Sequence, residues 1–158
     1  MPSINLYAIS KAELSDEIKD LAKEFENSSS SKLNLYKLTE EMAVVFLNNI
    51  DPCNDTTTIP YKMLFGNSTL LYYEYPEIGG FMPTSQIASI IEWIEQHKIE
   101  NFDEFSKMYD SISIECKNYL DDIGAIGKED LYFFYIKPMV DFYYKAYKNN
   151  NSILFCAE

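Results

Sequence analysis

The residues of this sequence best placed for acid–base chemistry are Tyr73, Glu74 and Tyr75. They end an apolar and aromatic run over 69–75 that predicts a strand, which Pro76 stops because a proline cannot donate to a sheet ladder. In a hydrolase that uses two carboxylates, Glu74 is the acid that this strand would offer. The same aromatic strand edge is also typical of a core or of a partner-binding surface, so both interpretations stay open.

The turn expected after this strand, Gly79-Gly80, does not provide a phosphate loop. It lacks the following lysine and the spaced third glycine that would place backbone amides around a phosphate. Together with Tyr73–Tyr75 it could border a small-ligand site, to which Phe81 adds an aromatic ring. From Phe81 to about Lys98 we expect a helix, whose isoleucines have the spacing of one buried face: Ile87, Ile90, Ile91 and Ile94.

His97, the only histidine of the chain, falls in the last turn of that helix. A positive charge there complements the helix dipole, so we expect a helix-end residue rather than a catalytic or zinc-binding one. Adjacent acids include Glu40-Glu41, Asp103-Glu104, Asp121-Asp122 and Glu129-Asp130. Neighbours on a helix point in different directions, so we expect solvated carboxylates rather than a shared-proton pair. No metal site and no cofactor is predicted.

The formal net charge is -12, and all 13 basic residues are lysines. Arginine is preferred for bidentate contacts to phosphate and guanine, and an acidic surface repels a nucleic-acid backbone. Both observations argue against a nucleic-acid reader and against a phosphate-clamping enzyme. An AT-rich genome, which favours Lys, Asn, Ile and Tyr codons, explains the lysine-only pattern but not so easily the excess of acids.

Tyrosine is the second excess, with 13 in the chain. Five tyrosines of the last predicted helix cannot all face one core, namely Tyr132, Tyr135, Tyr143, Tyr144 and Tyr147. Some are therefore exposed or shared with another chain, as in a homodimer. Tyrosine suits interfaces because it joins a large contact area to a hydroxyl, so we select Tyr143 and Tyr144 as contact residues and a basic protein as the expected partner. Codon usage with partly exposed rings is the alternative explanation.

The length of 158 residues is typical of one domain, which we expect to span 1–158. The predicted fold class is α+β, with a small mixed sheet packed by about five to six helices. Strands are predicted near 3–9, 69–75 and 152–157. The main helices are predicted at 10–25, 33–48, 81–98, 111–123 and 128–148, with an interruption at Pro138, and shorter ones at 60–65 and 102–109.

The cytoplasm is the expected location. No apolar run approaches the roughly 20 residues that span a bilayer, and residues 1–5 lack the basic start of a secretory signal. Cys53, Cys116 and Cys156 have no short spacing between any two, so we expect reduced thiols rather than disulfides or a zinc site.

Several segments follow one another in a recognisable order, namely Ile4–Ser10 before Glu13-Leu14, Leu35–Lys37, Pro60–Gly66, Gly79–Pro83 before Ile87, and Phe142–Tyr144 near the end. This order resembles the YfbM-like family of small bacterial proteins of unknown function. The resemblance implies an α+β fold and supplies no reaction. The chain departs from the family at Thr39–Met42, where the family has a tryptophan and a histidine, and at Glu77–Phe81, where it has a basic residue. A family site built on those residues would be replaced here.

These observations favour an acidic protein-binding domain without catalytic activity. One such role is that of an immunity or inhibitor protein that covers a basic toxin or nuclease. The alternative is a small-molecule-binding protein or hydrolase-like enzyme that uses Tyr73, Glu74, Tyr75 and the Gly79-Gly80 region. A third possibility is a structural member of the family with no site of its own.

Overall fold

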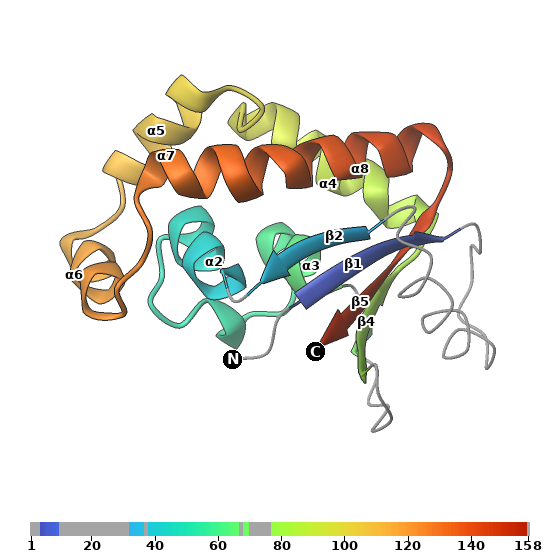
Figure 1. The fold of residues 1–158 in the computed structure, drawn as a ribbon, viewed down its shortest axis with the longest axis horizontal. Coiled ribbons are helices and arrows are strands. Elements are labelled where there is room, and N and C mark those ends of the chain that lie inside the picture. Colours follow the sequence, from blue (N-terminus) through green and yellow to red (C-terminus); the bar gives the residue numbers. More distant parts are fainter. Residues whose placement is uncertain (1–3, 10–31, 37, 67, 70–76, 158) are drawn as a thin grey trace.

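The computed structural model describes residues 4–9, 32–36, 38–66, 68–69 and 77–157. They form an α+β fold in which helices pack against a five-stranded sheet (Figure 1). The long helix α8 (Lys137–Lys148) lies along the sheet, and α4 (Thr84–His97) packs against α8. Among the helices of these described ranges, none is both long and apolar enough to cross a membrane.

The strand order in the sheet is β2 (Lys32–Tyr36), β1 (Ile4–Ile9), β5 (Ser152–Ala157), β4 (Glu77–Met82) and β3 (Ser68–Thr69). The two strands predicted near the ends of the chain are confirmed, and they are neighbours at the centre of the sheet, where Tyr7 is paired with Leu154. All pairings in this order are antiparallel, so the expectation of a mixed sheet is wrong. Strand direction depends on the path of the intervening helices, which residue patterns do not reveal.

Strand β2 occupies the first part of the helix expected over 33–48. The helix that forms there is α2 (Thr39–Leu47), while Leu33 and Leu35 lie on a strand that pairs with β1. Leu35 and Met42 fit one helical face, but Leu33 and Leu35 also alternate as in a strand. The edge of β1 decides between the two patterns, because pairing there satisfies the backbone groups of this segment.

Gly79 and Gly80 lie inside β4 and not in the turn expected from the sequence. Gly80 is paired with Phe155 of β5. A Cβ atom on Gly80 would lie 2.1 Å from the carbonyl oxygen of Phe65, the last residue of helix α3 (Ile59–Phe65). The glycine is therefore required by the close approach of a helix end to the strand, a reason that the sequence pattern does not distinguish from a turn.

The helix predicted after these glycines begins later than expected. Phe81 and Met82 end β4, and α4 begins at Thr84 after Pro83. Its four isoleucines are buried as predicted, namely Ile87, Ile90, Ile91 and Ile94. The strand expected over 69–75 and the helix expected over 10–25 lie mostly or wholly outside the described residues.

The remaining helices are the 3-10 turn η1 (Pro52–Asn54), α5 (Phe102–Asp110) and α6 (Ile114–Asp122). Thr58, Asn101 and Ser113 cap α3, α5 and α6, each through a side-chain oxygen that accepts a backbone N–H of the first turn. Gly66, with a φ of 94°, ends α3 as predicted. Because Ser113 is the cap of α6, the helix expected over 111–123 starts later than the apolar pattern suggests.

The last helical stretch consists of α7 (Lys128–Leu131), a π-helical turn η2 (Tyr132–Ile136) and α8. At its centre the backbone N–H of Lys137 donates to the carbonyl of Tyr132, which is the bond of a π turn. Pro138 has no N–H to donate, and its ring would clash with a carbonyl of the preceding turn in a regular helix. The wider turn accommodates it, so the predicted interruption at Pro138 is confirmed.

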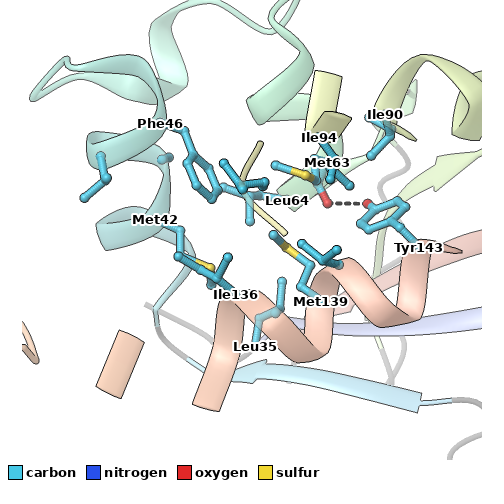
Figure 2. Close-up of a cluster of buried hydrophobic side chains, with 14 of the residues drawn as sticks. Leu35, Met42, Phe46, Met63, Leu64, Ile90, Ile94, Ile136, Met139 and Tyr143 are labelled. Carbon is cyan, nitrogen blue, oxygen red and sulfur yellow. Dashed lines mark hydrogen bonds between the residues drawn. The ribbon is translucent and has the colours of Figure 1, made fainter. Parts of the chain in front are cut away.

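Figure 2 shows part of the core that these elements enclose. Apolar side chains from the sheet and the helices meet there, namely Leu35, Met42, Phe46, Met63, Leu64, Ile90, Ile94, Ile136 and Met139. Tyr143 points into the same core, where its hydroxyl donates a hydrogen bond to the carbonyl of Met63. Cys116 and Cys156 are buried, and neither is in a disulfide in the structure.

Candidate functional site

The structure separates the site residues predicted from the sequence. Tyr73, Glu74 and Tyr75 lie outside the described residues. Phe81 is buried in β4, at 5% exposure, and Tyr143 is fully buried, at 0%. Burial also raises the pKa of the Tyr143 hydroxyl well above its ordinary value, so this residue stays neutral and bonded to Met63. Of the predicted residues that the structure describes, Tyr144 is the one at the surface.

Tyr144 joins helix α8 to the end of α4. Its hydroxyl lies 3.3 Å from Oε1 of Glu95, to which it donates a hydrogen bond. Partial burial raises the pKa of this hydroxyl, and the negative charges of Glu95 and Glu100 raise it further. Tyr144 is therefore a neutral hydrogen-bond donor that fixes the position of the Glu95 carboxylate.

An aromatic cluster lies where the start of α5 meets η2. The rings of Phe102 and Phe133 have centroids 5.0 Å apart, and Tyr132 contacts both. Phe133 is 50% exposed and the following Phe134 is 68% exposed. Two large apolar rings exposed within one helical turn are a feature that an interaction surface would explain.

Tyr132 is the buried base of this cluster. It is 1% exposed, and its ring stacks on Phe105 of α5 at 5.3 Å. Its hydroxyl has no hydrogen-bond partner among the described residues. Burial raises the pKa of this hydroxyl, and the charges of Glu100 and Asp141 add to the shift. A buried polar group without a partner is rare in native proteins and therefore needs an explanation.

We give the name acidic–aromatic face to the aromatic residues of η2 described above together with the residues linked to them by ring contacts or by charge. It consists of Glu95, Glu100, Phe102, Tyr132, Phe133, Phe134, Asp141 and Tyr144. All the charges that shift the pKa values of Tyr132 and Tyr144 belong to carboxylates. The face therefore combines a negative potential with apolar rings, which can bind a cation attached to an apolar stem.

A second cluster lies around Glu41, between α2 and the segment that follows α6. Glu41 is 9% exposed, its carboxylate accepts a hydrogen bond from the Ile126 amide, and its Oε2 has no partner in the described part of the chain. Burial is the main cause that raises the pKa of Glu41, and the nearby charge of Glu40 adds to it. The expectation of a solvated acid pair at these two positions is therefore wrong for Glu41.

The charges around Glu41 are mostly paired with each other. Glu40 accepts a hydrogen bond from the Tyr119 hydroxyl, and Nζ of Lys128 lies 2.9 Å from Oδ1 of Asp110. In the described ranges no three His, Cys, Asp or Glu residues are grouped so that they could hold a metal ion. The hydrogen bond from the Ile126 amide makes Glu41 a connection between α2 and the 123–127 segment.

Glu41 makes the stability of the fold depend on pH. Because its pKa is raised in the folded state, its protonated form stabilises the fold below the ordinary pKa of 4.5, and this stabilisation is lost as the pH rises through the folded-state value. We expect Glu41→Gln to be more stable than the parent at pH 7 by about 1 kcal/mol, or a Tm higher by about 2–4 °C, and to lose this advantage near pH 4. Thermal unfolding at both pH values measures the difference.

The control for this prediction is Glu92→Gln, which removes an exposed carboxylate from the middle of α4. Its unfolding should follow that of the parent at both pH values. If Glu41→Gln destabilises the protein equally at pH 7 and pH 4, the charge of Glu41 is well compensated in the fold and the assignment is wrong.

His97 behaves as the sequence predicts. It is the last residue of α4, is exposed, and stacks on Trp93 with ring centroids 4.3 Å apart. Its Nδ1 lies 3.0 Å from the carbonyl oxygen of Trp93. These contacts account for the histidine as a helix-end residue.

Comparison with solved structures identifies the fold. The crystal structure of YfbM from Escherichia coli, a protein of unknown function, matches over 100% of both chains with a TM-score of 0.61 and 14% sequence identity. The chain has the YfbM fold. The resemblance to YfbM-like proteins expected from the sequence is thus confirmed in three dimensions. At 14% identity the likeness to YfbM shows a shared fold alone, and because the function of YfbM is unknown it suggests no activity for this chain. No protein-family model and no curated protein matches the sequence.

The sequence analysis misses the carboxylates of the acidic–aromatic face. Glu95 and Glu100 lie at the end of α4 and just after it, and Asp141 lies on α8. Spacing within one helix cannot bring these acids together, because the two elements become neighbours only when α4 packs on α8. The aromatic excess of the last helix is the signal that the sequence does carry, and it correctly predicts that some of these rings are exposed.

Proposed function

We propose that this chain is a cytoplasmic, acidic protein-binding domain without catalytic activity, and that its partner is a basic protein that docks on the acidic–aromatic face. The observation that carries the proposal is the exposure of Phe133 and Phe134, 50% and 68%, in the π-helical turn whose first residue, Tyr132, is under the charge of Glu100 and Asp141. An aromatic centre surrounded by charge is the usual composition of a protein interface.

The two parts of the face contribute in different ways. Phe133 and Phe134 supply apolar area whose removal from water stabilises a complex, whereas Glu95, Glu100 and Asp141 select a partner of opposite charge. The net charge of -12 adds long-range attraction that speeds association with a basic protein. We therefore expect binding that weakens with salt but does not vanish, since salt screens only the charges.

A role as an immunity or inhibitor protein would use the same face. A basic toxin or nuclease presents positive charge where it binds phosphate groups. An acidic domain that covers this surface would compete with nucleic acid for it, and the exposed rings would hold the complex at the centre. The proposal predicts that the captured partner is inhibited in the complex.

The experiment is capture from a lysate of the source cell with the tagged parent and with Phe134→Ala. We expect a basic protein in stoichiometric amount, partly released by salt, and about tenfold weaker binding by the variant because one exposed ring is lost. Phe134 is 68% exposed, so its truncation should leave the Tm unchanged. The matched control is Ile114→Ala, which removes a side chain that is 72% exposed on α6, an element that contributes no residue to the face.

Two outcomes would contradict the proposal. One is a lysate in which the protein is always found alone, or only as a homodimer, by capture and size exclusion. The other is a partner that binds the parent and Phe134→Ala equally well but is lost with Ile114→Ala, which would place the interface on α6.

A further inference from the structure

We propose that Glu41 is a pH-sensitive latch, which in its protonated form holds the 123–127 segment against α2 and in its charged form favours release of that segment. The segment joins α6 to α7, and α6 lies at one end of the molecule beside α2 (Figure 1). Glu41 is not a residue of the acidic–aromatic face, so the latch goes beyond the proposed function and does not depend on it.

Glu41 links two segments that are far apart in the sequence. One oxygen of its carboxyl group accepts a hydrogen bond from the backbone amide of Ile126, and the other, Oε2, has no partner among the described residues. The side chain of Glu41 is only 9% exposed. A neutral carboxyl group is less costly in this position than a carboxylate, because a buried charge that lacks donors loses its hydration without compensation.

The titratable and charged groups around Glu41 come from all the helices packed near it. They are Glu40 of α2, Tyr109 and Asp110 of α5, Tyr119 and Asp121 of α6, and Lys128 of α7. The Lys128 ammonium lies 2.9 and 3.0 Å from the two carboxylate oxygens of Asp110, so its charge is already paired. The Tyr119 hydroxyl likewise donates to Glu40. Ionisation of Glu41 therefore adds a negative charge that these donors do not compensate.

The 123–127 segment is loosely packed at its two glycines. A Cβ atom on Gly124, which has a φ of 69°, would meet no described residue within 4 Å beyond its neighbours, and one on Gly127 would meet nothing closer than 4.0 Å. The backbone N–H groups of Gly124 and Ala125 donate to carbonyls of α6, so these bonds move with α6. The bond from the Ile126 amide to Glu41 instead ties the segment to α2, and its loss permits local opening.

The direction of the pH dependence follows from this geometry. Burial raises the pKa of Glu41, the bond from the Ile126 amide opposes the shift, and the charge of Glu40 adds to it. Opening exposes the carboxyl group to water and returns its pKa toward the ordinary value of 4.5. The closed state therefore binds the proton more tightly than the open state. Closing is favoured fully below the ordinary pKa, and this advantage is lost as the pH rises through the raised value.

Hydrogen exchange of the Ile126 amide, measured by NMR on the intact chain, reports opening of the latch directly. After correction for the intrinsic exchange rate, we expect its protection factor to be about fivefold higher at pH 4 than at pH 7. The protection factor should also stay below those of the slowest amides of β1 and β5 at the centre of the sheet, because the segment opens without global unfolding.

Substitutions separate the charge from the hydrogen bond. Glu41→Gln keeps an oxygen for the Ile126 amide and cannot ionise, so its protection factor at pH 7 should match that of the parent at pH 4 and change little with pH. Glu41→Ala lacks the acceptor and should give low protection at both pH values. Glu92→Gln removes an exposed carboxylate of α4 and should behave as the parent does.

Three results would overturn the latch. One is a protection factor of the Ile126 amide that is the same at pH 4 and pH 7, and another is a Glu41→Gln variant that keeps the pH dependence of the parent. The third is an Ile126 amide as strongly protected as the slowest amides of β1 and β5 at both pH values, because the segment would then open only when the whole fold unfolds. The proposed function is unaffected by these results, since its test depends on Phe134 and a captured partner.

Discussion

Replacing Gly80 with alanine is expected to destabilise the fold by about 3 kcal/mol. The new Cβ would lie 2.1 Å from the carbonyl oxygen of Phe65 and 3.2 Å from its carbonyl carbon. Both are backbone atoms at the end of α3, so no side chain can move aside to make room. The strand and the helix end would have to separate, and the pairing of β4 with β3 and β5 would be strained. Urea unfolding followed by circular dichroism measures the loss.

Gly127→Ala is the control for this change. The nearest atom to a Cβ at Gly127 is Oε2 of Glu129, at 4.0 Å, and the residue has a φ of -63° that any amino acid adopts. We expect a loss of less than about 1 kcal/mol. Equal losses in the two variants would mean that α3 does not approach β4 as closely as the structure shows.

Phe105→Ala is expected to cost about 3–5 kcal/mol, the usual range for an aromatic side chain removed from a core. Phe105 is 0% exposed and stacks on Tyr132 with ring centroids 5.3 Å apart and 28° between the planes. It also contacts Tyr109 edge to face at 6.2 Å. The truncation leaves a cavity directly beneath the acidic–aromatic face, so the Tyr132 ring should lose its fixed position as well. Thermal unfolding measures the first effect, and line broadening of the Tyr132 ring resonances the second.

Phe105→Leu separates packing volume from ring stacking. Leucine keeps most of the apolar volume, so we expect a loss of about 1–1.5 kcal/mol and a better ordered Tyr132 than in the alanine variant. If Phe105→Ala costs less than about 1 kcal/mol, the cluster of Phe105, Tyr109 and Tyr132 is not packed as described.

Local signals predict much of the helical part of the fold. The isoleucines of α4 lie at helical spacing and are buried, because their period is a property of the segment itself. Asn101 caps α5 through a local interaction too, because its side-chain oxygen accepts hydrogen bonds from backbone amides in the first turn of the same helix. Pro138 predicts its interruption because the missing N–H is a property of one residue.

Where a local pattern allows more than one structure, contacts between segments that are distant in sequence decide which structure forms. Leu33 and Leu35 form a strand because β1 offers a partner edge, and position 80 in β4 requires a glycine because α3 ends against it. Glu41 is buried although adjacent acids are typical of a solvated helix face, and the Ile126 amide from the 123–127 segment donates a hydrogen bond to it. In each case the deciding atoms are remote in sequence, so no local pattern contains them.

The features of the candidate site are also of two kinds, those that the sequence determines and those that the tertiary structure determines. The charge of -12, the 13 tyrosines and the aromatic run at the end of the chain are properties of the sequence alone, and they indicate an acidic surface with exposed rings. Which rings are exposed is a tertiary matter: Tyr143 lies in the core against Met63, Tyr132 lies buried on Phe105, and Phe134 is left in water. The π-helical turn before Pro138 and the packing of α4 on α8 set these positions, because they fix the direction of each side chain and bring the charges of Glu100 and Asp141 near enough to raise the pKa of Tyr132.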